Sequence, residues 1–296
     1  MIASDPGLVA RAEDPLAVLI TEPRRHPAAG PACRRNAVTL VGARRGLPLV
    51  LGPGFGCDQS MWRHVVPAFA DDHPVALLDH VGAGASDVTA YSSRRHSELT
   101  GYAEDLVEVL EELDLGPVVF VGHSASGMIG ARAAAARPEL FRGLVLIGAS
   151  PRYVDAPGWT GGFTEEDVEG VLRGIESDFA GFVAGLAPLA MGHAERPELA
   201  AELHDSMLGL RHDIALEFAR AIFLGDHRCV LPLISTPTLV IQPAEDPMVP
   251  EVAAEQMAAA IPGSRYRRLA ATGHYPHLSS PDETSDVIRS FLATLA

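Results

Sequence analysis

Residues 118–128 read VVFVGHSASGM, and this stretch decides the fold. The first four residues are apolar and β-branched or aromatic, which predicts a buried strand. The residues from Ala125 to Ala136 are nearly all small and apolar, which predicts a helix that ends before Pro138. Between them lies Ser124, flanked by Gly122 and Ser126, where only small residues let the two backbones approach. The pattern predicts a sharp strand-turn-helix that presents a serine side chain.

Two interpretations of this turn compete. A strand-end glycine followed by an N-cap serine gives the same short string. A nucleophilic serine needs the strand before it and the helix after it, and both are predicted here. Ser126 replaces the usual second glycine and is still small. The context favours Ser124 as a nucleophile.

Strands and helices alternate on both sides of this turn, which predicts a mostly parallel, doubly wound α/β sheet. Short runs that are apolar on both faces predict buried parallel strands. They lie at Leu49–Leu51, Val75–Leu78, Val118–Val121, Leu144–Ile147, Thr238–Ile241 and around Tyr266–Leu269. The predicted helices of this core are Tyr102–Leu113, Ala125–Ala136 and Pro281–Leu295.

Residues 152–228 interrupt the alternation with helical patterns only. Thr164 and Asp167 resemble a capping box. Further helices are predicted at Asp178–Gly185, Pro197–Leu208 and Asp213–Phe223. An all-helical insertion between two strands is expected to form a lid over the carboxyl edge of the sheet, where ligands of such sheets bind. The sheet domain then comprises residues 33–151 and 229–296.

Residues 1–32 differ in composition from the rest, with five prolines among Ala and Arg residues. We expect a poorly ordered extension, with one short helix near Leu16–Ile20.

Composition excludes several functional classes. A net charge of −15 over 296 residues disfavours a nucleic-acid partner or an anionic membrane surface. The sequence contains no run of 18 apolar residues, so no membrane-spanning helix is predicted. The N-terminal residues lack the pattern of a secretory signal. The three cysteines have no metal-ligand spacing. We expect a cytoplasmic protein with neither metal nor cofactor.

A serine nucleophile needs a base and a third group that orients the base, in the chain order Ser, Asp or Glu, His. Asp246 follows the strand at Thr238–Ile241, with Glu245 as its competitor. His274 follows a glycine in the loop before the last helix, with His277 as its competitor. His123 comes too early in the chain and is expected to pack or to form a hydrogen bond.

The same mechanism needs backbone N–H donors for an oxyanion. The N–H of Ala125 is one candidate because it directly follows the nucleophile. The N–H of Phe55, in the glycine-rich loop after Leu49–Leu51, is the other. A phosphate-binding loop is excluded here, because neither the glycine spacing nor a following Lys-Ser/Thr pair is present. Together these features predict an α/β-hydrolase fold.

Longer motifs resemble a known group. GFGCDQSMW at 54–62, DHVGAGASD at 79–87, GHS at 122–124, SPRYV at 150–154 and GHYPHLS at 273–279 resemble the RsbQ-type bacterial stress-response hydrolases and their plant relatives, the karrikin and strigolactone receptor hydrolases. The likeness covers roughly residues 34–295. Pro53 and Cys57 resemble the bacterial branch, whereas Ser126 resembles the plant branch.

The resemblance implies a triad of Ser124, Asp246 and His274 under a four-helix lid. It implies an apolar pocket for a small hydrophobic ligand, lined by Phe55, Phe163, Leu186 and Phe223. The expected activity is hydrolysis of a small ester, lactone or enol ether. The alternative is a slow, ligand-sensing module that binds a regulatory phosphatase. Dehalogenases and epoxide hydrolases of this fold are disfavoured because they carry Asp where this chain has Ser124.

Overall fold

A seven-stranded sheet forms the centre of the molecule, which we describe from a computed structural model covering residues 30–295. The strand order is β1-β3-β2-β4-β5-β6-β7, and only β1 is antiparallel to its neighbour. The strands are β1 Thr39–Gly42, β2 Leu49–Gly52, β3 Pro74–Leu77, β4 Val118–His123, β5 Phe141–Ile147, β6 Thr238–Gln242 and β7 Arg265–Arg268. Every predicted strand is present. The one strand missed, β1, is a four-residue edge strand with only one buried residue.

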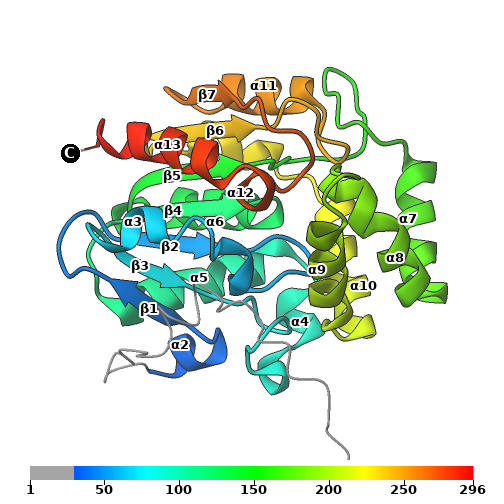
Figure 1. The fold of residues 1–296 in the computed structure, drawn as a ribbon, viewed down its shortest axis with the longest axis horizontal. Helices are drawn as coiled ribbons and strands as arrows, with labels where there is room; N and C mark the ends of the chain where they lie inside the picture. The colour runs from blue at the N-terminus through cyan, green and yellow to red at the C-terminus, as the bar shows by residue number, and fades with distance from the viewer. Residues whose placement is uncertain (1–29, 296) are drawn as a thin grey trace, which may run out of the picture.

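Helices cover both faces of the sheet (Figure 1). On one face, α5 (Leu99–Leu113) packs beside α6 (Ala125–Ala136), and on the other lie α3 (Pro67–Ala70) and α13 (Pro281–Leu292). The small residues of α6 let it lie directly on the sheet. A side chain at Gly130 would place its Cβ 2.3 Å from the Phe120 ring. The close packing of α6 on the sheet therefore depends on the small residues from which the helix was predicted.

Four helices between β5 and β6 stack at one end of the sheet (Figure 1). They are α7 Glu165–Ser177, α8 Phe179–Met191, α9 Pro197–Leu208 and α10 His212–Phe223. The capping box at the start of α7 forms both of its hydrogen bonds, between Thr164 and Asp167. The helix predicted at Asp178–Gly185 runs on to Met191, because its apolar sequence continues until Gly192, which takes φ 70°.

Of the extension expected for residues 1–32, residues 1–29 lie outside the described residues, whereas Pro31 and Ala32 belong to a helix. Pro31–Arg35 form a short helix, α2, in which Ala32 is buried. The backbone N–H groups of Ala32 and Cys33 donate to the Glu112 carboxylate on α5, at 3.3 and 2.5 Å. This side chain satisfies N–H groups that a helix start leaves unpaired. The helix predicted near Leu16–Ile20 lies outside the described residues.

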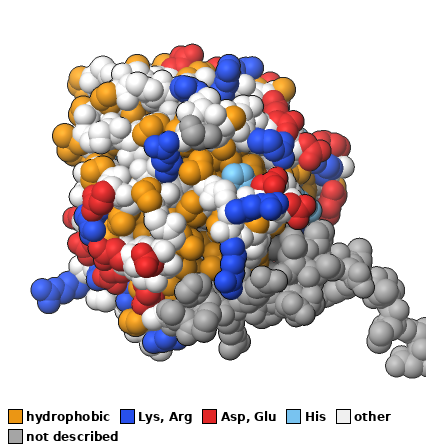
Figure 2. All heavy atoms as spheres, turned by 90° about the vertical axis from the view of Figure 1, so that its left-hand side faces the viewer, with side chains coloured by type: hydrophobic (Ala, Val, Ile, Leu, Met, Phe, Trp, Pro, Cys, Tyr) orange, Lys and Arg blue, Asp and Glu red, His pale blue; other side chains and the backbone are white. Residues whose placement is uncertain are grey.

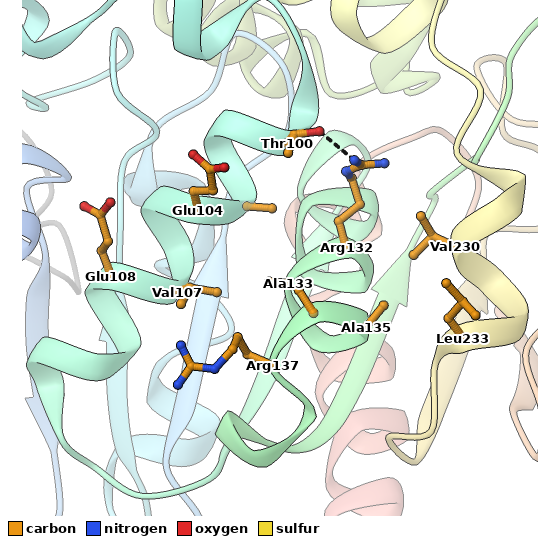
Figure 3. Close-up of a pocket in the computed structure, with 12 residues that line it drawn as sticks. Thr100, Glu104, Val107, Glu108, Arg132, Ala133, Ala135, Arg137, Val230 and Leu233 are labelled. Atoms are coloured by element: carbon orange, nitrogen blue, oxygen red, sulfur yellow. Dashed lines mark hydrogen bonds between the residues drawn. The ribbon is translucent and has the colours of Figure 1, made fainter.

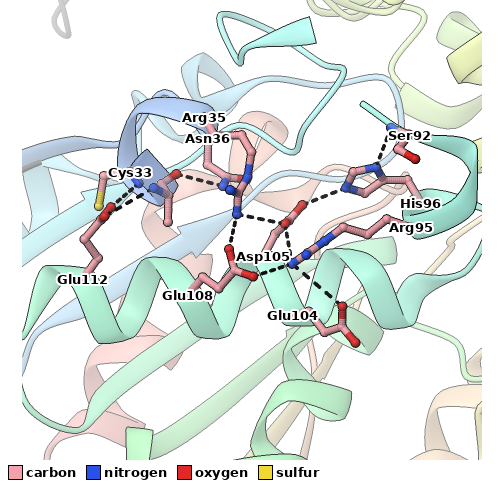
Figure 4. A network of polar contacts seen from close by, with 11 residues as sticks. Cys33, Arg35, Asn36, Ser92, Arg95, His96, Glu104, Asp105, Glu108 and Glu112 are labelled. Atoms are coloured by element: carbon pink, nitrogen blue, oxygen red, sulfur yellow. Dashed lines mark hydrogen bonds and ion pairs between the residues drawn. The ribbon is translucent and has the colours of Figure 1, made fainter. Parts of the chain in front are cut away.

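A buried carboxylate fastens α2 and α4 (Ser93–His96) to α5 (Figure 4). The side chain of Asp105 is 3% exposed and lies 3.1 Å from Arg35, 2.9 Å from Arg95 and 2.9 Å from His96 Nε2. Removing any one partner would leave buried charge less compensated. The network fixes the edge of the core beneath α10, whose Glu217 accepts from Ser93.

Acidic and basic side chains are interspersed with hydrophobic ones on the face drawn in Figure 2. On this face no continuous basic patch of the kind that holds nucleic acid is present. Between residues 30 and 295, no helix has the length and apolarity needed to cross a membrane.

Candidate active site

Ser124 occupies the sharp turn between β4 and α6. Its backbone has φ 52° and ψ −117°, a strained conformation for a residue other than glycine. The turn is closed by small residues, because a Cβ at Gly122 would lie 2.5 Å from the Ser126 carbonyl oxygen. Ser124 is 7% exposed. Strain at this serine is typical of a site whose side chain must be aimed at a ligand.

The structure brings the predicted acid and base into contact. His274 Nδ1 lies 2.8 Å from Asp246 Oδ2 and 3.0 Å from Oδ1. The Asp246 side chain is fully buried and also accepts from the N–H groups of Met248 and Val249, at 2.8 and 3.1 Å. A carboxylate held in this way fixes the tautomer of the imidazole and supports its positive charge.

Glu245, the competing acid, is placed differently. Its side chain is exposed, and only its backbone takes part, since Gly273 N–H donates to the Glu245 carbonyl oxygen at 2.7 Å. Gly273 takes φ 78°, and a Cβ there would lie 2.0 Å from the Met191 carbonyl oxygen. The glycine therefore allows the His274 loop to pass closely under the lid.

Ser124 and His274 line one cavity beneath the lid. It is small, with about 30 Å³ of free space. Three of the four predicted pocket residues line it: Phe55, Leu186 and Phe223. Phe163 is not among the lining residues, and its role in binding stays a prediction. Its ring packs behind the lining, 6.1 Å from Tyr153 and 6.2 Å from Phe223.

Sequence reasoning missed most of the other lining residues, which are Tyr153, Ala190, Met207, Ile222, Met248 and Tyr275. Tyr153 and Tyr275 are the polar residues of this group, and Tyr153 forms a hydrogen bond with Ser124. Burial raises its pKa to about 12, and a hydrogen bond with Ser124 opposes that shift. Its place in the motif SPRYV was the only signal, because nothing in its local pattern separates it from a core tyrosine.

The glycine-rich loop after β2 runs against the turn that holds Ser124. A Cβ at Gly54 would lie 2.5 Å from His123 Nδ1 and 3.3 Å from Ser124 Cβ. The next residue, Phe55, lines the cavity, and Ala125 is the first residue of α6. The two predicted N–H donors thus belong to backbone segments on either side of Ser124.

A cluster of neutral rings supports the His274 loop from below. His123 Nε2 donates to the His274 carbonyl oxygen at 2.8 Å. The His123 ring lies 4.5 Å from that of His277, which stacks on Trp62 at 4.5 Å. Burial lowers the pKa of His277 to about 3 and that of His123 well below its usual range. His123 therefore packs and forms a hydrogen bond, as predicted.

We expect thermal stability to fall as the pH is lowered from about 7 towards 4. Burial lowers the pKa of His80 to about 4 and that of His277 to about 3, whereas histidines in the unfolded chain ionise near pH ~6.5. In this window the unfolded chain binds more protons, so the free energy of unfolding decreases on acidification. Asp79, whose pKa burial raises to about 6, acts in the opposite sense but is a single group.

Melting temperatures measured between pH ~4.5 and ~8 test this expectation, with a fall of roughly 5–15 °C towards the acid end. The variant His277→Phe keeps a ring against Trp62 but binds no proton, so its melting temperature should fall less steeply. If the melting temperature falls equally steeply with pH in the variant and the parent chain, His277 does not contribute to the pH dependence.

A larger cavity lies elsewhere, between α5, α6 and the 3-10 helix η4 (Arg228–Leu233) (Figure 3). Its volume is about 530 Å³, and its lining is largely apolar apart from side chains such as Arg132 and Glu104. It shares no lining residue with the cavity at Ser124. Volume alone would favour this cavity as the active site, but the strained Ser124 and the paired His274 line the smaller one.

Within residues 30–295, no group of three or more His, Cys, Asp or Glu side chains is arranged to hold a metal ion.

Comparison with known proteins agrees with this geometry. A family model described as alpha/beta hydrolase fold matches residues 48–281. The karrikin insensitive 2 receptor CA of Petunia hybrida is 39% identical over 241 residues, which are 81% of this chain and 89% of the receptor. The strigolactone esterase D14 of Arabidopsis thaliana is 38% identical over 82% of this chain and 91% of its own.

Among solved structures, a hydrolase from Oleispira antarctica matches with a TM-score of 0.86 at 33% identity, over 89% of this chain and 96% of its own. The likeness to the plant receptor hydrolases is therefore confirmed, while the likeness to the RsbQ-type branch stays a prediction. The matched residues 48–281 include strands β2 to β7, the lid and every residue that lines the cavity at Ser124. This chain belongs to the alpha/beta hydrolase family and is an enzyme of its esterase type.

Proposed function

We propose that this enzyme hydrolyses a small, largely apolar ester or lactone, or an enol ether that also carries such a carbonyl group, through an acyl-enzyme formed on Ser124. The observation that carries the proposal is the 2.8 Å contact of His274 with the buried Asp246, in the cavity that Ser124 also lines. A paired imidazole beside a strained serine is the arrangement that acyl transfer needs.

In the first step His274 Nε2 takes the Ser124 proton while Oγ attacks the carbonyl carbon. The N–H groups of Phe55 and Ala125 donate to the oxyanion. The bond to the leaving oxygen then breaks, and His274 returns the proton to it. Water, activated by the same imidazole, hydrolyses the acyl-enzyme and restores Ser124. Asp246 stays ionised throughout and holds His274 Nδ1–H.

The small apolar cavity supports a compact substrate. About 30 Å³ of free space holds only a few atoms, so a larger acyl group requires the lid side chains to move. The lining offers few polar groups beyond Tyr153 and the triad. Relatives named karrikin receptor and strigolactone esterase support the same range of small ligands.

Intact-protein mass spectrometry with a panel of short p-nitrophenyl esters and small butenolides tests the proposal. We expect an adduct on Ser124 that decays as product accumulates. An adduct on His274 instead would indicate transfer of the butenolide ring to the imidazole. If neither an adduct nor turnover is found across the panel, the proposal is wrong.

The second candidate is a ligand-sensing module with slow turnover that binds a phosphatase. Relatives at 36–39% identity named as receptors favour it, as does the nearly filled cavity. A pull-down with a co-encoded phosphatase, with and without a butenolide, separates the two functions. Association that changes with the ligand supports the sensing role, and no association in either state opposes it.

Substrate size should depend on Met207, which lines the cavity from α9. The Met207 side chain presses on the glycine-rich loop, since a Cβ at Gly56 would lie 2.9 Å from Met207 Cγ. We expect Met207→Ala to raise the ratio of kcat/KM for p-nitrophenyl hexanoate over the acetate by roughly tenfold, because it makes room for the extra methylenes.

The neighbouring variant Leu208→Ala serves as the control for that measurement. Leu208 is on the same helix but is 40% exposed, so the ratio should stay within about twofold of the parent value. If Met207→Ala leaves the ratio unchanged as well, the acyl chain does not occupy this part of the cavity.

A further inference from the structure

Ser126 stands where the usual turn motif carries a second glycine, and its side chain is fully buried. The Ser126 hydroxyl donates to the Pro53 carbonyl oxygen at 2.5 Å. His80 Nε2 lies 2.6 Å from the same hydroxyl oxygen. The three residues come from separate segments; Ser126 directly follows Ala125, and Pro53 lies two residues before Phe55.

The protons on this chain can be assigned from the groups present. The Pro53 carbonyl can only accept, so the Ser126 hydroxyl must give its one proton to it. The hydroxyl oxygen then accepts from His80, which must carry its proton on Nε2. Burial lowers the pKa of His80 to about 4, so the ring is neutral near neutral pH and this tautomer persists. The two hydrogen bonds therefore run in the same direction, from His80 Nε2–H to Ser126 and from the Ser126 hydroxyl to Pro53.

The sheet register explains why these groups meet. Strands β3, β2 and β4 are adjacent and parallel, and Gly52 pairs with Gly122. His80 follows β3, Pro53 follows β2, and Ser126 follows β4. A Cβ at Gly52 would lie 2.8 Å from Ser126 Oγ, so glycine is required where the serine side chain crosses to the loop. A hydrogen bond that is shielded from water is electrostatically stronger than one in solvent, so the bond from Ser126 restrains the backbone at Pro53.

We infer that Ser126 and His80 are positioning residues that hold the loop Gly52–Phe55 so that the Phe55 N–H is aimed at the oxyanion; this inference rests on the proposed acyl transfer at Ser124. The hydroxyl of Ser126 lies one residue beyond Ala125, the other donor. One side chain therefore fixes the distance between the two backbone segments that would share the negative charge.

A lid residue packs on the same anchor. The Phe218 ring on α10 lies 6.1 Å from the His80 ring and 5.8 Å from the Phe55 ring. It also contacts Tyr102 of α5 at 4.6 Å. The loop is thus held by the hydrogen bond from Ser126 on one side and by apolar contact from the lid on the other.

Kinetics of Ser126→Ala and His80→Phe test the catalytic part of the inference. Each should lower kcat and kcat/KM for p-nitrophenyl butyrate by the same factor, roughly 10–100-fold, because the donors act mainly on the transition state. The Ki of a trifluoromethyl ketone, which forms a tetrahedral oxyanion, should rise by that same factor. His80→Gln retains an N–H donor and should recover most of the loss. Ser285→Ala removes a buried hydroxyl in α13 and should change none of these values.

Hydrogen exchange of the peptide covering residues 50–58 tests the anchor without any turnover. Exchange should be faster in Ser126→Ala and His80→Phe than in the parent chain or in Ser285→Ala. Unchanged exchange in both variants overturns the anchor. Faster exchange with unchanged kcat and Ki overturns its link to the oxyanion. If the parent chain hydrolyses no ester, the proposed function fails, whereas the exchange rates still decide whether His80 and Ser126 hold the loop.

Discussion

Ser124→Ala is expected to lower kcat for short p-nitrophenyl esters by at least ~10⁴-fold, which is the scale of losing a triad nucleophile. The strained turn gives the serine its position, but without the hydroxyl no atom can form the acyl-enzyme. The remaining rate should come from the oxyanion donors and from binding alone. Purified variant and parent are compared in the same ester assay, with active-site titration by a fluorophosphonate.

The Ser285→Ala variant is the control for this experiment. Ser285 is also buried, but it lies in α13. It should keep full turnover and full labelling by the fluorophosphonate. Turnover by Ser124→Ala within tenfold of the parent would show that another group is the nucleophile, or that water attacks directly.

Asp246→Asn is expected to lower kcat by about 10³–10⁴-fold, because an amide no longer supports the imidazolium and can hold the wrong tautomer of His274. Two backbone N–H groups position the Asp246 carboxylate. We therefore do not expect the neighbouring Glu245 to take its place. The variant should still fold, since the amide oxygen can accept from the same N–H groups.

Glu245→Gln gives a matched test of that assignment, because it makes the same chemical change one residue away. The Glu245 side chain is exposed, so the variant should retain kcat within about twofold. The assay uses p-nitrophenyl butyrate across a range of pH. If Glu245→Gln lowers kcat more than Asp246→Asn does, the acid of the triad is Glu245. The 2.8 Å contact between His274 Nδ1 and Asp246 Oδ2 is then only structural.

The small-residue pattern around Ser124 was enough to predict the turn, because strand and helix backbones can only meet closely where side chains are small. The order of Asp246 and His274 in the chain placed both on loops after late strands. Parallel strands end at one edge of a sheet, so the loops had to come near Ser124. These are constraints of local geometry and topology, and they can be deduced without coordinates.

Other features needed the three-dimensional arrangement. The contacts that hold the Asp246 carboxylate, which accepts from the N–H groups of Met248 and Val249, are an example. Strand β1 was missed because an edge strand need not be apolar on both faces. The start of α2 is held to the core by Glu112, far along the chain, which accepts from the N–H groups of Ala32 and Cys33.

The sequence by itself determined the fold, the position of the strained serine and the set of groups that could act with it, because each follows from periodicity, residue size and chain order. Tertiary structure alone added Met207 and Tyr153 to the cavity lining and placed the Phe163 ring against Tyr153. It also linked His80 to the Pro53 carbonyl oxygen through the Ser126 hydroxyl. An apolar or buried polar side chain has the same local pattern wherever it points, so only packing between distant segments distinguishes a pocket wall, an anchor and the core.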